Sequence, residues 1–428
     1  MQFTENNPSS FIPIPLPTNQ NQAATFLGRA RPWPGLPTPK PSIPNCMEQL
    51  LVHCATAVDR NDTTLAQQIL WVLNNIAPPD GGPTQRLASA FLRALTARAG
   101  GPNLLAASPS PPHTFSAVEL AAFVDLTPWH RFGFTAANAA ISASTACACS
   151  SLHVVDLSTT FCMQIPTLID ALSSHPPPLL RLTVADTSRF VTPPALDLSY
   201  DELGARLVGF ARSRNMAMEF TSICTRPSDG FSNLIEHLRL QQHSENKDEA
   251  LVINCHMMLH YTPDETLAES GGGISCRTAF LNEIRSLNPS LVVVVDEDVD
   301  FTSNDLVRRL RSAYDYLWIH YDAVDTLLPE GSKQREWYEA DVCRKIEDVV
   351  AREGTRRVER VESKGRWARR MRAAGFVEVG FGEEAVAEVK GMLEEHAAGW
   401  GLKREEDGHL VLTWKGHNAV FATAWVPA

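Results

Sequence analysis

Between residues 151 and 325, short apolar runs alternate with stretches whose apolar residues recur at helical spacing. A short run with adjacent valines is typical of a strand buried on both faces, whereas apolar positions three and four residues apart predict an amphipathic helix. The predicted strands are residues 152–157, 179–185, 216–223, 250–255 and 291–295, and the predicted helices are residues 165–172, 201–214, 231–242, 277–287 and 304–322. Repeated strand–helix–strand units predict an α/β fold, with a mostly parallel sheet and helices on both faces.

The remaining pattern divides the chain into a tail and one domain. Residues 1–45 are rich in Pro, Asn, Gln and Thr, which predicts a disordered tail. Within it, Arg31 to Pro41 is either a plain spacer, which we favour, or a polyproline recognition motif. We expect the domain to span residues 46–428, with helices over 46–144 and an α/β core over 151–428. After residue 325 we expect helices at 331–352 and 384–398, a strand at 376–382, and antiparallel strands at 409–415 and 419–426.

The helical segment from Cys46 onwards has two interpretations. Its apolar stripes predict three helices, with Asp62 or Thr63 as the cap of the second. The stripes either pack on one another as a helical cap or form a surface for a dimer or a partner. The candidate surface residues are Leu50, Leu51, Leu65, Ile69 and Leu73.

Composition and charge exclude several classes of protein. The 428 residues are 44% hydrophobic, as in ordinary globular proteins, and no apolar run reaches the roughly 18 residues of a membrane span. The net charge of -11 argues against a chain that binds nucleic acid over its whole surface, but it allows a local basic patch. The nine scattered cysteines contain no CxxC pair, so we expect reduced thiols inside the cell. The N-terminus has no basic segment followed by an apolar core, so we expect no secretory signal.

The loop after the first strand, Asp156 to Pro166, is where a dinucleotide or a methyl donor binds in sheets of this kind. Glycines normally let the backbone approach such a ligand, and this loop has none. Asp186, after the second strand, has the position of a ribose-binding carboxylate. The pattern is that of a Rossmann-like, methyltransferase-like core without the loop that a cofactor needs, so we predict no cofactor.

Two other polar patterns contain residue types that bind metal ions. His256 and His260 are four residues apart, but Met257 stands where a zinc peptidase has its glutamate. We interpret this pair as ordinary polar packing at a turn. The acidic run Asp296 to Asp300 follows a strand and either binds Mg²⁺ or, as we favour, ends the strand. Because no nucleophile motif or phosphate-binding loop accompanies them, we predict no metal ligands, no catalytic residues and no enzyme activity.

A basic run between Arg356 and Arg372 stands out from the acidic background. It contains eight basic and two acidic residues, a net charge of +6. It is either a solvated helix face paired with nearby glutamates, which we favour, or a patch that contacts DNA phosphates. The candidate DNA-binding residues are Arg356, Arg357, Arg360, Lys364, Arg366, Arg369, Arg370 and Arg372.

Six blocks between residues 46 and 428 occur in the order found in the GRAS proteins, a family of plant transcriptional regulators. The strand LHVVD (Leu152, His153, Val154, Val155 and Asp156), with Gln164 and Pro166, resembles the VHIID motif. The other blocks resemble the first leucine-rich region (46–95), the segment before VHIID (135–141), the second leucine-rich region (203–223), PFYRE (254–265, 287–300 and 321–329) and SAW (356–376 and 410–425).

The resemblance implies a nuclear protein with a Rossmann-like core, a helical cap and no known catalytic activity. It implies a role in transcription, by binding DNA or by bridging DNA-bound transcription factors. It also implies a protein that often forms a homodimer or heterodimer and does not associate with a membrane. The VHIID loop departs from the family pattern, because Phe161 and Cys162 replace Gln-Gly and Ile165 replaces Trp. The SAW motif lacks its Ser at Ala422 to Trp425. The loop changes weigh against a ligand site there.

Two alternatives stay open at this point. One is an adaptor whose negative charge keeps it off DNA, so that a partner supplies the specificity. The other is a methyltransferase-like enzyme or a sensor of a small ligand.

Overall fold

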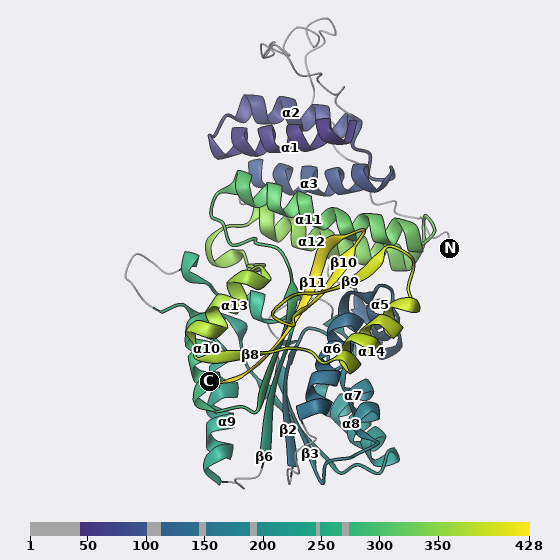
Figure 1. The fold of residues 1–428 in the computed structure, drawn as a ribbon. Coiled ribbons are helices and arrows are strands. Elements are labelled where there is room, and N and C mark those ends of the chain that lie inside the picture. Colours follow the sequence, from purple (N-terminus) through teal and green to yellow (C-terminus); the bar gives the residue numbers. More distant parts are fainter. Residues whose placement is uncertain (1–42, 101–112, 145–150, 189–194, 245–248, 268–273) are drawn as a thin grey trace, which may run out of the picture. The chain divides into compact units, whose positions relative to one another are not determined.

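The computed structural model describes residues 43–100, 113–144, 151–188, 195–244, 249–267 and 274–428 (Figure 1). These residues belong to one compact unit, Ile43–Ala428. Helix α1 (Ile43–Asp59) begins inside the range predicted to be a tail. The rest of that tail, including Arg31 to Pro41, lies outside the described residues. Within the described ranges, no helix is both long and apolar enough to cross a membrane.

Five parallel strands form one half of a nine-stranded sheet. They are β2 (Ser151–Ser158), β3 (Leu180–Asp186), β5 (Met218–Cys224), β6 (Glu249–His256) and β7 (Leu291–Glu297). All five predicted strands are confirmed, each within two residues of its predicted ends. Their order, β5-β3-β2-β6-β7, is that of doubly wound sheets, so a topological switch point lies between β2 and β6.

Antiparallel strands form the other half, so the sheet is mixed and not mostly parallel. Strand β11 (His417–Pro427) pairs with β7 along one edge, and with β10 (Leu410–Trp414) and β8 (Phe376–Val379) along the other. Strand β9 (Trp400–Arg404), which the sequence pattern did not predict, pairs with β10. The tight turn between β10 and β11, with Lys415 and Gly416 at φ 47° and 86°, requires antiparallel pairing.

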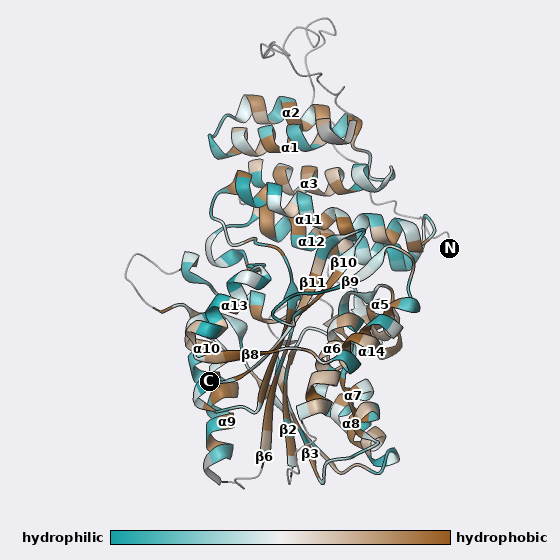
Figure 2. Ribbon diagram, in the orientation of Figure 1, coloured by the Kyte–Doolittle hydropathy of each residue, from teal (hydrophilic) through white to brown (hydrophobic). Residues whose placement is uncertain are grey.

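Helices cover both faces of the sheet, as predicted. One face carries α6 (Pro128–Ser144), α7 (Ile165–Leu172), α8 (Tyr200–Ser213) and α14 (Glu383–Glu394). The other carries α9 (Ser232–Ser244), α10 (Cys276–Ser286) and α13 (Lys364–Ala373). Side chains of β2 alternate between two apolar cores, and Figure 2 shows apolar strands between helices with polar outer sides.

A helical cap packs on α11 (Leu306–Leu327) and α12 (Lys333–Ala351). It consists of α1, α2 (Thr63–Ile76) and α3 (Pro83–Ala99), and Asp62 caps α2 by accepting a hydrogen bond from the Leu65 N–H at 3.0 Å. Arg86 of α3 makes ion pairs with Asp325 at 2.9 Å and Glu339 at 3.0 Å. The cap is thus joined to helices from the second half of the chain.

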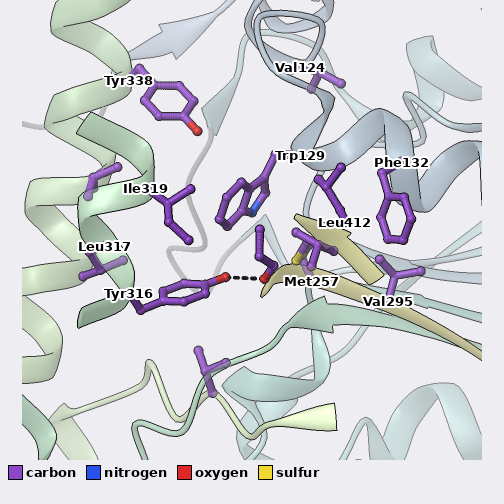
Figure 3. Packing of buried hydrophobic residues seen from close by; sticks show 14 of the residues in the cluster. Val124, Trp129, Phe132, Met257, Val295, Tyr316, Leu317, Ile319, Tyr338 and Leu412 are labelled. Atoms are coloured by element: carbon purple, nitrogen blue, oxygen red, sulfur yellow. Dashed lines mark hydrogen bonds between the residues drawn. The ribbon is translucent and has the colours of Figure 1, made fainter. Parts of the chain in front are cut away.

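Aromatic side chains lock α11 and α6 onto the sheet (Figure 3). The Tyr316 hydroxyl of α11 donates a hydrogen bond to the Ala419 carbonyl of β11 at 2.5 Å. The Trp129 ring of α6 lies 6.0 Å from the Tyr316 ring. A short helix, α5 (Ala117–Val124), and a two-residue parallel pair, β1 (Thr114–Phe115) with β4 (Ala195–Leu196), complete the packing.

Candidate functional site at the carboxyl ends of the strands

A buried polar network occupies the carboxyl ends of β2 and β6, where a doubly wound sheet binds its ligands. The Asn254 amide donates to Asp156 and to Gln164, each at 2.9 Å, and Gln164 donates to Asn138 of α6 at 2.9 Å. Ser158 donates to the second Asp156 oxygen at 2.8 Å. Burial raises the pKa of Asp156, although the hydrogen bonds oppose the shift. The Asp156 carboxyl is therefore engaged with the protein's own side chains.

The VHIID-like strand contributes to packing along its whole length. Leu152, Val154 and Val155 lie in the two apolar cores. His153 is buried, with its Nε2 at 2.8 Å from the Thr183 hydroxyl. These residues hold β2 between β3 and β6, and Asp156 alone of the five reaches the strand-end network.

The loop after β2 keeps an unusual backbone where the family pattern has Gln-Gly. Phe161 and Cys162 have φ values of 48° and 59°, in the left-handed region that favours glycine. The Phe161 ring packs against Tyr200 at 5.7 Å, and Cys162 is buried. The loop thus adopts a left-handed turn without glycine, and the side chains of Phe161 and Cys162 pack against the protein at this turn.

Each carboxylate of the acidic run has a partner within the protein. Asp296 contacts His260 Nδ1 at 2.7 Å, and Glu297 accepts two hydrogen bonds from Lys345 at 2.7 Å. Asp298 accepts from the Lys364 N–H at 3.0 Å, and Asp300 accepts from Arg366 at 3.0 Å. These contacts favour the structural interpretation of the run over a Mg²⁺ site.

His256 and His260 have different surroundings. The Nε2 of His256, at the end of β6, lies 3.2 Å from Nδ1 of His130 on α6. His260 lies in a 3₁₀ turn against Asp296. Burial lowers the pKa of His256, whereas for His260 the charge and hydrogen bond of Asp296 outweigh burial and raise the pKa. The two rings serve polar packing at the turn.

Glu362 gathers three arginines into an enclosed ionic cluster. Its carboxylate lies 3.2 Å from Arg277 and from Arg366, and it accepts a hydrogen bond from Arg370 at 2.6 Å. Arg277 also donates to the Arg360 carbonyl at 2.6 Å and lies 5.3 Å from the centre of the Trp367 ring. The basic run is thus built into the junction of α10 with α13.

The structure sorts the eight candidate DNA-binding residues into three groups. Arg357 and Arg360 are buried, with Arg357 bonded to the Phe301 carbonyl at 2.5 Å and Arg360 paired with Asp264 at 3.2 Å. The partly enclosed or ion-paired members are Lys364 (with Glu405), Arg366 (with Asp300 and Glu362), Arg370 (with Glu265 and Glu362) and Arg372 (with Glu378).

Arg356 and Arg369 form the third group. Both are exposed, and neither guanidinium forms a hydrogen bond or an ion pair with another side chain among the described residues. The sequence pattern could not separate these two arginines from the other six, because the carboxylates that engage the others come from distant segments. The phosphate-contact prediction therefore stays a prediction, carried mainly by Arg356 and Arg369.

The candidate association surface on the cap is also divided. Leu51, Ile69 and Leu73 are buried inside the cap, and Leu50 is partly buried against the same core. Leu65 is 43% exposed, and Trp71 and Val72, which were not among the five predicted surface residues, are 52% and 37% exposed on the same helix. The sequence feature that could have identified this exposed surface is the absence of any charged residue in α2.

A cavity of about 390 Å³ lies against α12. Its lining combines aromatic and charged side chains, including Arg93, His113, Phe115, Trp337, Asp341 and Arg344. The His113 and Trp337 rings, which both line it, stack with their centres 4.2 Å apart.

These features define a mixed α/β domain with a helical cap, in which the described polar groups at the strand ends engage one another. The chain belongs to the GRAS domain family, which matches residues 47–426. It is 58% identical to Scarecrow-like protein 32 of Arabidopsis thaliana over 91% of this chain and 97% of that protein. It is 31% identical to SHORT-ROOT of the same plant over 89% of this chain and 73% of that protein.

A crystal structure of SCL7 from Oryza sativa has the same fold. It aligns with a TM-score of 0.69 over 89% of this chain and 99% of that chain, at 22% identity. This likeness shows that the mixed α/β architecture and its helices are shared. GRAS-family relatives are plant transcriptional regulators.

Proposed function

We propose that this chain is a nuclear, non-enzymatic regulator of transcription that bridges DNA-bound proteins through the outer face of α2. The Rossmann-like core serves as the scaffold that carries the cap. Partners are other transcription factors, including relatives with the same domain, and association through the cap gives homodimers or heterodimers.

The outer face of α2, which we define as Leu65, Trp71 and Val72, carries this proposal. All three are exposed, and the fourteen residues of α2 include no charge. Solvent-facing helices normally carry charged residues, whereas the centres of protein interfaces are depleted of charge and enriched in Trp. Such a face fits an apolar partner helix or loop better than it fits a phosphate backbone.

The charge distribution supports bridging over direct DNA contact. The net charge is -11, and six of the eight residues in the basic run are buried or engaged by carboxylates and carbonyls. Binding to DNA phosphates needs several Lys or Arg side chains that are not already paired within the protein. The affinity for DNA increases with each phosphate that such a side chain neutralises. Direct contact through Arg356 and Arg369 is the second candidate, supported by the exposure of both side chains.

Two variants separate these candidates. The first, L65K/W71E/V72K, puts charges on the outer face of α2, and V118K/L240E is its matched control on exposed apolar positions of α5 and α9. The second, R356A/R369A, removes the exposed arginines. Retention of each protein on chromatin would be measured in plant nuclei, with circular dichroism of the purified protein to confirm folding.

Bridging predicts that L65K/W71E/V72K is lost from chromatin while R356A/R369A and the control stay bound. It also predicts that purified wild-type protein shows no salt-dependent binding to a random duplex pool. If purified protein binds DNA with an affinity that falls steeply with salt, and R356A/R369A loses that binding, the bridging proposal is wrong and direct contact replaces it.

A further inference from the structure

A close approach of two glycines brings together side chains from β8 and from the turn between β9 and β10. Gly408 of the turn has φ 79°, and a Cβ atom there would lie 2.5 Å from the Cα of Gly380, just after β8. The Phe381 N–H donates to the Gly408 carbonyl at 3.1 Å. The close approach requires the bare backbone of glycine at Gly408, and the hydrogen bond fixes the turn against the end of β8.

This approach clusters Glu378, Asp407 and His409. Glu378 lies on β8 opposite Trp425 of β11, and His409 lies just before β10. One ligand atom from each of the three residues lies within 4.8 Å of the other two. The side chains of Glu378 and Asp407 are 19% and 29% exposed, so solvent reaches the cluster from one side.

The His409 imidazole is fully enclosed and lacks hydrogen-bond partners among the described residues. Its Nδ1 lies 3.0 Å from an Asp407 oxygen, but the angle does not make a hydrogen bond, and Nε2 also has no partner. The Trp425 ring, 5.6 Å away, restricts the imidazole on one side. Buried polar groups are normally paired. An enclosed imidazole with two unpaired nitrogens beside two carboxylates is therefore expected to bind a further partner.

The donor set indicates what that partner is. One imidazole nitrogen and two carboxylate oxygens suit Zn²⁺, which is commonly bound by three such protein ligands and a water. Hard cations such as Mg²⁺ and Ca²⁺ prefer oxygen ligands throughout. Two ligands of a tetrahedral zinc ion lie roughly 3.3 Å apart, close to the spacing of Asp407 and His409.

The cations near the cluster are placed so that Zn²⁺ can replace one of them. Arg372 pairs with Glu378, and Lys364 pairs with Glu405, so Glu378 and Asp407 keep an excess of negative charge facing the imidazole. Arg372 is 54% exposed and can move into solvent. We propose that Glu378, Asp407 and His409 form a Zn²⁺ site that ties β8 to the β9–β10 turn.

Zinc binding to the full chain, purified without a histidine tag and stripped with a chelator, tests this proposal. Competition with a chromophoric zinc indicator gives the affinity and the stoichiometry. Co²⁺ substitution gives the ligand type, because nitrogen and oxygen ligands lack the intense near-ultraviolet band of thiolate ligation. This readout separates the site from any zinc held by the cysteines.

We expect one Zn²⁺ per chain at this site and a Co²⁺ spectrum without thiolate bands. Asp407→Asn and Glu378→Gln keep the side-chain shapes and should each weaken binding by about tenfold or more. Glu406→Gln removes an exposed neighbouring carboxylate outside the triad and should leave the affinity nearly unchanged. Arg372→Ala removes the competing cation and should strengthen binding.

Zinc should also raise the midpoint of thermal unfolding of the wild-type chain, and of Glu406→Gln, but not of Asp407→Asn. Failure of the wild-type chain to bind Zn²⁺, or binding that Asp407→Asn and Glu378→Gln leave unchanged, would overturn the proposal.

Discussion

Arg277 and Glu362 form an ion pair at 3.2 Å in which both side chains are fully enclosed by protein. Arg277 lies on α10, and Glu362 lies just before α13. Burial of two charges is costly, and it is offset here because Glu362 faces three arginines while Arg277 donates to three carbonyls. The charges that looked in the sequence like a DNA-contacting surface therefore largely hold the core together.

Glu362→Ala should destabilise the protein by about 3–5 kcal/mol, because it leaves Arg277 charged and unpaired in the interior. Urea unfolding followed by tryptophan fluorescence measures the loss. Arg369→Ala, at an exposed position of α13, is the control and should change stability by less than about 0.5 kcal/mol. Equal effects of the two substitutions would contradict the ionic cluster.

Gly133→Ala and Gly209→Ala should change stability in opposite directions, although both put a methyl group on a helix. At Gly133 of α6 the new Cβ would lie 2.5 Å from the His256 ring and 2.6 Å from Val295, so we expect a loss of about 1–3 kcal/mol. At Gly209 of α8 nothing lies within 4 Å, and the helix should gain about 0.5–1 kcal/mol. Denaturant midpoints of the two variants give the signs, and a shared sign would refute the close approach of α6 to the sheet.

The Glu265–Arg370 ion pair should make stability fall on the acid side. Hydrogen bonding from Arg370 lowers the pKa of Glu265 from 4.5 to about 2. A carboxyl with a lowered folded pKa contributes stability above its unfolded pKa, and this contribution is lost as the pH falls from about 4.5 towards 2. Glu265→Gln should flatten this part of the profile.

The measurement for this pair is the free energy of unfolding between pH 2 and 7. Glu236→Gln, an exposed carboxyl on α9, serves as the control and should keep the wild-type slope. If Glu265→Gln has the same acid slope as wild type, the ion pair does not act in solution.

Leu73→Ala and Trp71→Ala should separate the inner from the outer face of α2. Leu73 is fully buried in the cap, so its truncation should cost about 2–5 kcal/mol. Trp71 is 52% exposed, and its truncation should cost less than about 1 kcal/mol while reducing association with partner proteins. Thermal unfolding and co-precipitation from plant nuclei measure the two effects, and a large stability loss at Trp71 would show that it belongs to the cap core.

The strands and most helices could be predicted because their signal is local. A buried parallel strand needs a continuous apolar run, so the five strands between Leu152 and Val295 could be recognised in the sequence. The GRAS blocks could be recognised for the same reason, because each is a short continuous segment and the blocks occur in a fixed order. The absence of glycine in the loop at Phe161 and Cys162 was also visible, although only the structure shows that the backbone there keeps the left-handed turn.

The sequence by itself determined the order of strands and helices, the family and the position of the charged runs. Only the tertiary structure decided which charged side chains are unpaired and which leucines are exposed. Arg360 is buried and paired with Asp264, which lies 96 residues earlier in the chain, and Leu73 is buried because α2 packs against α1 and α3. Exposure and ion pairing depend on residues distant in the chain, and hydrophobic periodicity carries no information about those partners.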